Sequence, residues 1–226
     1  MTHAPSTAPK ATPADSQQRP NTPAEAWAAL QAGNARFVAE TPAHPHQDVH
    51  ARSALAQAQR PFAIFFGCAD SRVAAEIIFD QGLGDLFVVR TAGHVVDPSV
   101  LGSLEFGVAV LGAPLIVVLG HDTCGAVGAA MKSVATGVIP PGYLRDIVER
   151  VTPSVLSATR AGRTSVELVE REHVEATCNL LAERSTLIAS RVADGSLAIV
   201  GAEYNLAHGE AAVVRVVGDI GPTNAS

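Results

Sequence analysis

The 226-residue sequence lacks a long apolar segment, a basic cluster and a cysteine framework, and each absence excludes a class of protein. No stretch reaches the roughly 18 consecutive apolar residues that would span a bilayer. The N-terminus has no basic region followed by an apolar one, so it does not resemble a signal peptide. Lysines and arginines do not cluster and the net charge is −6, which argues against nucleic-acid binding. Three cysteines do not make a secreted disulfide scaffold, so we expect a cytoplasmic protein.

Hydrophobic residues make up 47% of the chain, which is ample for one packed domain. Residues 1–21 are rich in Ala, Pro, Thr and Ser without apolar periodicity, and this composition predicts a disordered tail. The pattern then changes: Thr22 is a suitable N-cap, Pro23 suits the first turn, and Glu25 completes a capping-box pattern. The sequence therefore predicts an N-terminal helical arm at the start of a single domain that covers 22–226.

Short apolar runs alternate with helical patterns through the middle of the chain, after a predicted loop at Thr41–His50. The apolar runs are Phe62–Phe66, Leu86–Val89 and Leu115–Leu119, and the helical patterns are Val73–Phe79, Pro98–Leu111 and Ala126–Val134. Such alternation favours right-handed βαβ units and a parallel sheet. Polar helices follow over 142–192, and the last two apolar runs, Leu197–Gly201 and Ala211–Val217, predict an antiparallel hairpin. The predicted fold is a single α/β domain with a central, mostly parallel β-sheet, an antiparallel edge hairpin and flanking helices.

Three residues of metal-ligating type follow two of the predicted strands. Cys68 comes after the first apolar run, and His121 and Cys124 come after the third. Two thiolates and an imidazole are donors that zinc prefers, and three protein ligands leave a fourth position open. The carboxyl ends of neighbouring parallel strands meet at one edge of an α/β sheet, so the three side chains are predicted to converge. The alternative is that the cysteines are inert buried side chains, which are common.

Further residues beside these candidate ligands suggest a reactive site. Asp70 and Arg72 are two residues apart, so they can form a bidentate ion pair. The carboxylate could instead turn to the metal as a fourth ligand, or the pair could be an ordinary surface ion pair worth little. Gly120 and Gly125 allow tight backbone beside the ligands. Gly125 opens a predicted helix, and its N–H could therefore face an anionic substrate.

The segment 68–72 (CADSR) and the motif His121-x-x-Cys124 together strongly resemble the zinc motifs of the β-class carbonic anhydrases, and of the bacterial branch in particular. The resemblance continues through 87–93 (FVVRTAG) and 102–106 (GSLEF). It covers most of the chain after the N-terminal tail.

This resemblance implies a zinc enzyme, with one Zn²⁺ per chain, that reversibly hydrates carbon dioxide to bicarbonate and a proton. Cys68, His121 and Cys124 would be the protein ligands of zinc. Water or hydroxide would take the fourth position in the active form, and Asp70 in a resting form. Asp70 paired with Arg72 would orient the zinc-bound hydroxide that attacks carbon dioxide. The resemblance also implies a homodimer or a homotetramer.

Some members of the family are inhibited by bicarbonate at a separate pocket built from a Trp, an Arg and a Tyr. Arg90 and Tyr204 match two of these positions, but Phe65 stands where the tryptophan is expected, which argues against the pocket. His94 is a conceivable proton shuttle, although a structural or surface role is favoured.

Phe87, Val95 and Phe106 are candidates for an apolar slot that holds carbon dioxide, some of them contributed across the dimer, and each is equally explained as core. Two other functions remain open at this stage. The same zinc set could hydrolyse carbonyl sulfide or carbon disulfide. A non-catalytic, zinc-stabilised module would instead have a closed site with four permanent ligands.

Overall fold

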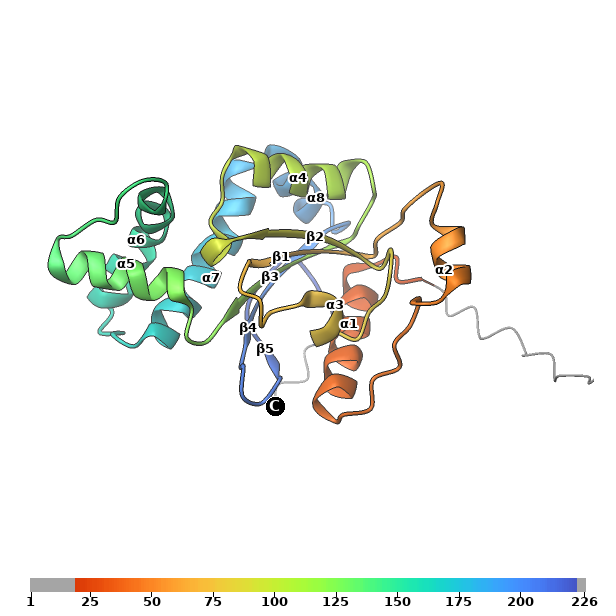
Figure 1. Cartoon of the computed structure of the whole chain (residues 1–226). Coiled ribbons are helices and arrows are strands. Elements are labelled where there is room, and N and C mark those ends of the chain that lie inside the picture. The colour runs from red at the N-terminus through yellow and green to blue at the C-terminus, as the bar shows by residue number, and fades with distance from the viewer. Residues whose placement is uncertain (1–18, 223–226) are drawn as a thin grey trace, which may run out of the picture.

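A computed structural model describes residues 19–222, which form a five-stranded sheet with helices around it (Figure 1). The strand order is β2-β1-β3-β4-β5; the first four strands are parallel, and β5 pairs antiparallel with β4. The strands are β1 (Ala63–Cys68), β2 (Leu86–Thr91), β3 (Leu115–His121), β4 (Ala198–Tyr204) and β5 (Ala211–Val217). The predicted α/β fold with its antiparallel edge hairpin is confirmed. Residues 1–18 of the predicted tail lie outside the described residues.

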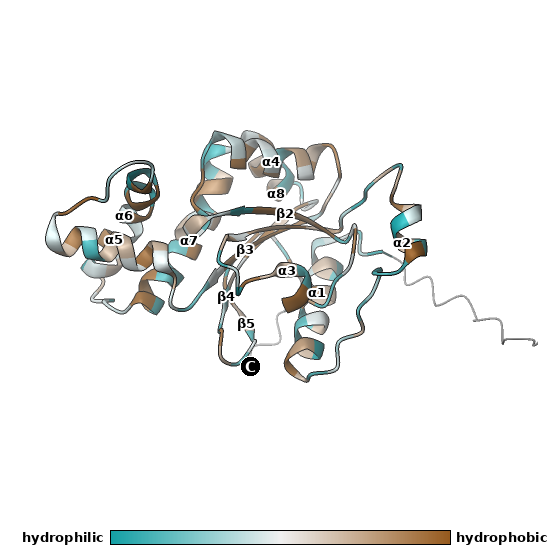
Figure 2. Ribbon diagram, in the orientation of Figure 1, coloured by the Kyte–Doolittle hydropathy of each residue, from teal (hydrophilic) through white to brown (hydrophobic). Residues whose placement is uncertain are grey.

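The two central strands, β1 and β3, are buried along their whole length. Their sequences are nearly continuous apolar runs because helices cover both faces of a parallel sheet. Successive side chains point to opposite faces, so Phe65 packs in one core cluster while Ile64 and Phe66 pack in another. Figure 2 shows mainly hydrophobic residues along the edge strand β2, which is half-buried over most of its length.

Helices cover both faces and one end of the sheet (Figure 1). They are α1 (Pro23–Val38), α2 (Val49–Ala54), α3 (Ala75–Ile78), α4 (Pro98–Ala109), α5 (Gly125–Thr136), α6 (Leu144–Arg160), α7 (Val166–Arg184) and α8 (Thr186–Ala193), with a 3₁₀ turn η1 (Ala92–His94). α1 begins as predicted, because the Thr22 hydroxyl accepts the Glu25 N–H and the Glu25 carboxylate accepts the Thr22 N–H. Trp27 and Leu30 bury the inner side of α1 in the same cluster as Phe65. The N-terminal arm therefore packs on the sheet of its own chain.

Helix α2 overlaps the predicted loop at Thr41–His50, so that prediction is wrong at its C-terminal end. The Asp48 carboxylate caps this helix by accepting the Ala51 N–H at 2.7 Å. All six residues of α2 are exposed or half-buried. The helix therefore has no buried apolar face that hydrophobic periodicity could reveal.

A third apolar cluster covers the carboxyl ends of β1 and β3. α5 and α6 project beyond this end of the sheet, with α7 beside them (Figure 1). Val127 of α5 packs there with Val151 and Val155 of α6, and Cys68 and Cys124 belong to the same cluster. The two thiols therefore lie between the sheet and a small helical core.

Candidate metal centre

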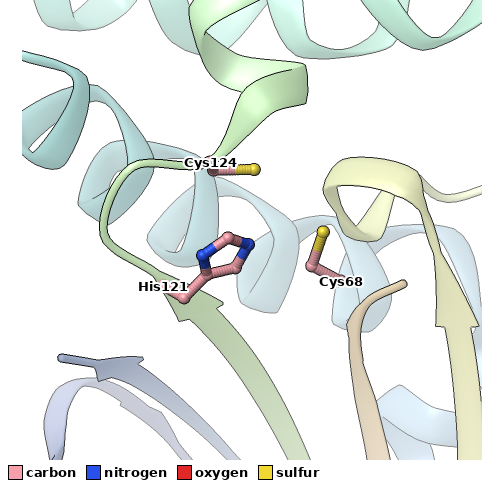
Figure 3. A group of neighbouring side chains, drawn as sticks. All are labelled: Cys68, His121 and Cys124. Atoms are coloured by element: carbon pink, nitrogen blue, oxygen red, sulfur yellow. The ribbon is translucent and has the colours of Figure 1, made fainter. Parts of the chain in front are cut away.

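Three metal-ligating side chains converge where β1 and β3 end (Figure 3). Cys68 is the last residue of β1, His121 is the last residue of β3, and Cys124 is the N-cap of α5. The two Sγ atoms and a ring nitrogen of the histidine lie within 4.8 Å of one another, and all three residues are buried. The parallel pairing of β1 with β3 brings residues 53 positions apart to one edge, as the sequence predicts.

The imidazole of His121 is held in one tautomer. Its Nδ1 lies 2.8 Å from the backbone oxygen of Asp122. A carbonyl oxygen can only accept, so Nδ1 carries the proton and Nε2 presents a lone pair. Nε2 is buried and has no hydrogen-bond partner among residues 19–222. An orphaned acceptor beside two thiols suits a metal ion, and the backbone bond at the other nitrogen fixes the ring orientation.

The two thiols of the group influence each other's ionisation. The neighbouring Cys124 thiol holds the pKa of Cys68 well below its usual value, and the proximity of Cys68 raises the pKa of Cys124. The Gly93 N–H also donates to Cys68 Sγ at 3.3 Å. The sulfur of Cys68 is therefore the better anion of the two, and a divalent cation would displace the remaining proton between them.

Asp70 and Arg72 form the predicted bidentate pair at the mouth of the site. Arg72 donates from Nε to Oδ1 at 2.9 Å and from Nη2 to Oδ2 at 2.7 Å. The guanidinium holds the pKa of the Asp70 carboxyl well below its usual range. Asp70 Oδ2 lies 3.9 Å from His121 Nε2. The carboxylate thus sits on Arg72 while remaining close to the ligand cluster.

Arg90 supports the loop that carries this pair. Its Nε donates to the backbone oxygen of Cys68 at 2.9 Å, and its Nη2 donates to that of Asp70 at 2.5 Å. Arg90, which the sequence matches to one position of a bicarbonate pocket, therefore also holds the backbone of the loop that carries Asp70 and Arg72. Phe65, at the expected tryptophan position, is buried in the sheet core, and Tyr204 is buried as well.

A buried carboxylate lies behind the histidine ligand. Glu170 of α7 is fully buried and accepts the backbone N–H of His121 at 3.3 Å through Oε1. Burial raises the pKa of Glu170 to about 8. The ring of His94 lies nearby, with Nδ1 3.5 Å from the same Oε1. His94 is completely buried, so its predicted surface alternative is wrong and a structural placement is observed.

The remaining predicted substrate-binding residues differ in how close they lie to the metal-ligating group. Gly125 is the first residue of α5, directly after the second thiol. Val95 packs in the same apolar cluster as both thiols. Phe87 packs instead in a sheet cluster, and the exposed Phe106 lies against it with ring centroids 6.0 Å apart. Of the three predicted slot residues, Val95 is therefore the one that packs beside the ligands.

The fold and the site together define an α/β protein with a Cys-His-Cys metal-binding group at the ends of two parallel strands. A family model described as carbonic anhydrase matches residues 63–211. The chain belongs to the carbonic anhydrase family, within its β class.

Relatives that are named carbonic anhydrases match this chain over most of its length. Carbonic anhydrase 2 of Mycobacterium tuberculosis is 59% identical over 203 residues, which cover 89% of this chain and 98% of that protein. A carbonic anhydrase of Mycolicibacterium smegmatis is 58% identical and covers 88% of this chain and 97% of its own length. The solved structure of a Coccomyxa β-carbonic anhydrase in complex with acetazolamide has a TM-score of 0.63 at 27% identity, covering 74% of this chain and 78% of that chain.

Proposed function

We propose that this protein catalyses the reversible hydration of carbon dioxide to bicarbonate and a proton at a single zinc ion. The observation that carries the proposal is the buried Cys-His-Cys group with an Asp–Arg pair at its open side. Relatives that are 59% and 58% identical are named carbonic anhydrases. Those names favour carbon dioxide as the substrate over carbonyl sulfide or carbon disulfide.

The donor set fits zinc. Cys68 and Cys124 would bind through Sγ and His121 through the unpartnered Nε2, and these are sulfur and nitrogen ligands of the kind zinc takes in catalytic sites. Zinc in such a site acts as a Lewis acid that acidifies a water molecule, the chemistry for which carbonic anhydrases are the standard example. Three protein ligands leave room for that water, which a closed structural site would not.

The Asp70–Arg72 pair would orient the attacking oxygen. Because Arg72 occupies one side of the carboxylate with two hydrogen bonds, Asp70 stays ionised and can accept a hydrogen bond on its other side. If the carboxylate left Arg72, it could serve as a fourth ligand, which would block the position that water needs. We therefore propose that release from Arg72 converts an active site into a resting one.

The product is an anion and the substrate is apolar, so the site needs both kinds of surface. Gly125 begins α5, and the first N–H groups of a helix lack partners within that helix. We propose that the Gly125 N–H faces bicarbonate. Val95, packed beside the thiols, would supply part of the apolar wall for carbon dioxide.

Stopped-flow measurement of carbon dioxide hydration, on protein of known zinc content, tests this function. Cys68→Ala should lose zinc and turnover, since one of three protein ligands is gone. Cys178→Ala is the matched control, because Cys178 is a buried cysteine of α7 that packs on the sheet in a different cluster from Cys68. Full zinc occupancy and turnover in Cys68→Ala would refute the ligand assignment. Bound zinc without turnover in the unaltered protein would favour the non-catalytic module.

We further propose a cytoplasmic homodimer or homotetramer. Large apolar side chains are exposed along the α5–α6 end, including Val138, Tyr143 and Leu144. Zinc-binding thiols persist best in a reducing compartment, which supports the location. Across residues 19–222 no helix is both long and apolar enough to cross a membrane. Light scattering coupled to gel filtration would measure the assembly, and a monomer at assay concentration would contradict it.

A further inference from the structure

The sulfur of Cys68 receives a hydrogen bond from a backbone amide that is held by its neighbours in α5 and α7. The donor is Gly93 N–H in η1, at 3.3 Å from Sγ. Gly93 has φ 63° and ψ 27°, a left-handed conformation that glycine adopts readily. A Cβ at this position would lie 2.6 Å from the Cβ of Ala126, so α5 also closes the space around it. In Figure 3 the turn beyond Cys68, drawn in the pale yellow of the segment after β2, stands over the thiol.

A histidine from α7 holds the other side of the same residue. His173 Nε2 lies 3.0 Å from the backbone oxygen of Gly93, and His173 is 5% exposed. Because the carbonyl oxygen can only accept, Nε2 must carry the proton. Nδ1 then accepts from the hydroxyl of Ser154 in α6, at 2.9 Å. Burial lowers the pKa of His173 to about 4, so the ring is neutral at pH 7 and has a single N–H to donate.

These bonds form one connected path through four elements. It runs from Ser154 on α6 to His173 on α7, then to Gly93 in η1, and ends at Cys68 on β1. Ser154 and His173 are both buried. Neither residue belongs to the metal-binding group or to the Asp–Arg pair. The path therefore reaches the site only through the Gly93 N–H on the Cys68 sulfur.

We propose that His173, fixed by Ser154, is a positioning residue that aims the Gly93 N–H at the Cys68 sulfur and so sets how strongly this thiolate donates to the metal. The inference rests on the proposed function, since it requires Cys68 to be a zinc ligand. An N–H bond to a thiolate withdraws electron density from sulfur, and hydrogen bonds to ligand sulfurs tune metal centres. Losing His173 would let the η1 turn relax and would change both metal affinity and the sulfur–metal bond.

The test compares two substitutions at one position. His173→Leu removes the N–H donor, whereas His173→Gln keeps an N–H that can reach the Gly93 oxygen. Leu181→Ala is the packing control, because Leu181 is a buried α7 residue that packs in a sheet cluster and takes no part in the hydrogen-bonded path. Zinc affinity is measured by chelator competition. The cobalt-substituted protein reports the sulfur–metal bond through its thiolate-to-cobalt charge-transfer band.

His173→Leu should weaken zinc binding by about 10- to 100-fold, the usual effect of losing a group that supports a ligand, and should shift the charge-transfer band. His173→Gln should restore both values toward those of the unaltered protein. Leu181→Ala should lower the melting temperature while leaving affinity and band unchanged. A His173→Leu protein with normal affinity and band would overturn the inference, as would an equal band shift in Leu181→Ala.

A smaller change keeps the test decisive if His173→Leu does not fold. Ser154→Ala removes the bond to Nδ1 and should shift the band in the same direction by less; an unchanged band would overturn the inference.

The unaltered protein and Cys68→Ala separate this result from the proposed function. If the unaltered protein gives no thiolate band, both proposals fail. If it gives a band that Cys68→Ala weakens but His173→Leu leaves intact, this inference alone fails.

Discussion

Replacing Gly93 by alanine should destabilise the protein more than the same change at another left-handed glycine. Gly93 (φ 63°) and Gly137 (φ 71°) both have positive φ, so an alanine at either costs roughly 1–2 kcal/mol. At Gly137, the C-cap of α5, no described atom would lie within 4 Å of the new Cβ. At Gly93 the new Cβ would lie 2.6 Å from that of Ala126, so η1 or α5 must move.

Crowding of this kind typically costs a further 1–3 kcal/mol or so. Gly137→Ala should therefore lower the free energy of unfolding by about 1–2 kcal/mol, and Gly93→Ala by about 2–5 kcal/mol. Urea unfolding at fixed protein and zinc concentrations measures both values. Gly93→Ala should also weaken zinc binding, because its amide moves relative to Cys68, whereas Gly137→Ala should not. Equal losses of stability in the two variants would refute the close packing of η1 against α5.

Three further changes test the site and its support. Arg72→Ala should keep one zinc per chain but lower kcat/KM for hydration by on the order of 10²-fold, because Asp70 loses its partner; an unchanged kcat/KM in stopped flow would contradict this. Burial raises the pKa of Glu170 from 4.5 to about 8. Between these two pH values the folded chain keeps a proton that the unfolded chain has released, so the free energy of unfolding falls as the pH rises from 4.5 to about 8. Glu170→Gln should therefore be more stable by about 3 kcal/mol at pH 7, with the difference shrinking toward pH 5 in urea unfolding. Asn34→Ala should cost about 2–4 kcal/mol, because its amide bonds three backbone groups that join α1 to α3, to the β4–β5 loop and to the start of β5, and a loss below 1 kcal/mol would count against that role.

The predictable part of the site lies in short segments at strand ends. Cys68 and His121 follow apolar runs that have the length of strands and little polarity, as central strands of a parallel sheet do. Parallel pairing then places both strand ends at one edge, whatever the details of the helices between them. Asp70 and Arg72 were equally accessible to prediction, because two residues in one turn can meet without help from the rest of the fold.

The contacts that support the ligands come from distant elements and have no local signal. Glu170 reaches the His121 amide across 49 residues, and His173 reaches the Gly93 carbonyl across 80. In the sequence, Glu170 and His173 stand in a polar helical stretch and cannot be told from exposed residues. Their burial follows only from how α7 packs on the rest of the chain. His94 shows the same difficulty, since its burial follows from the η1 turn, where it adopts φ 40°, and from contact with α7.

The glycines beside the ligands explain why these distant contacts matter. The sequence interpretation gave Gly120 the role of permitting tight backbone, yet Gly120 is an ordinary residue of β3. A Cβ there would lie 2.5 Å from Val174 Cγ2 and 2.7 Å from Glu170 Oε1, so the small residue is needed because α7 packs directly on the strand. Gly93 is crowded in the same way by α5. α7 thus packs so closely on Gly120 that its shift would disturb the backbone beside His121, and α5 packs so closely on Gly93 that its shift would move the amide that donates to Cys68. Enlarging Ala126 of α5 or Val174 of α7, the side chains that touch these glycines, should consequently alter metal binding although neither residue is a ligand.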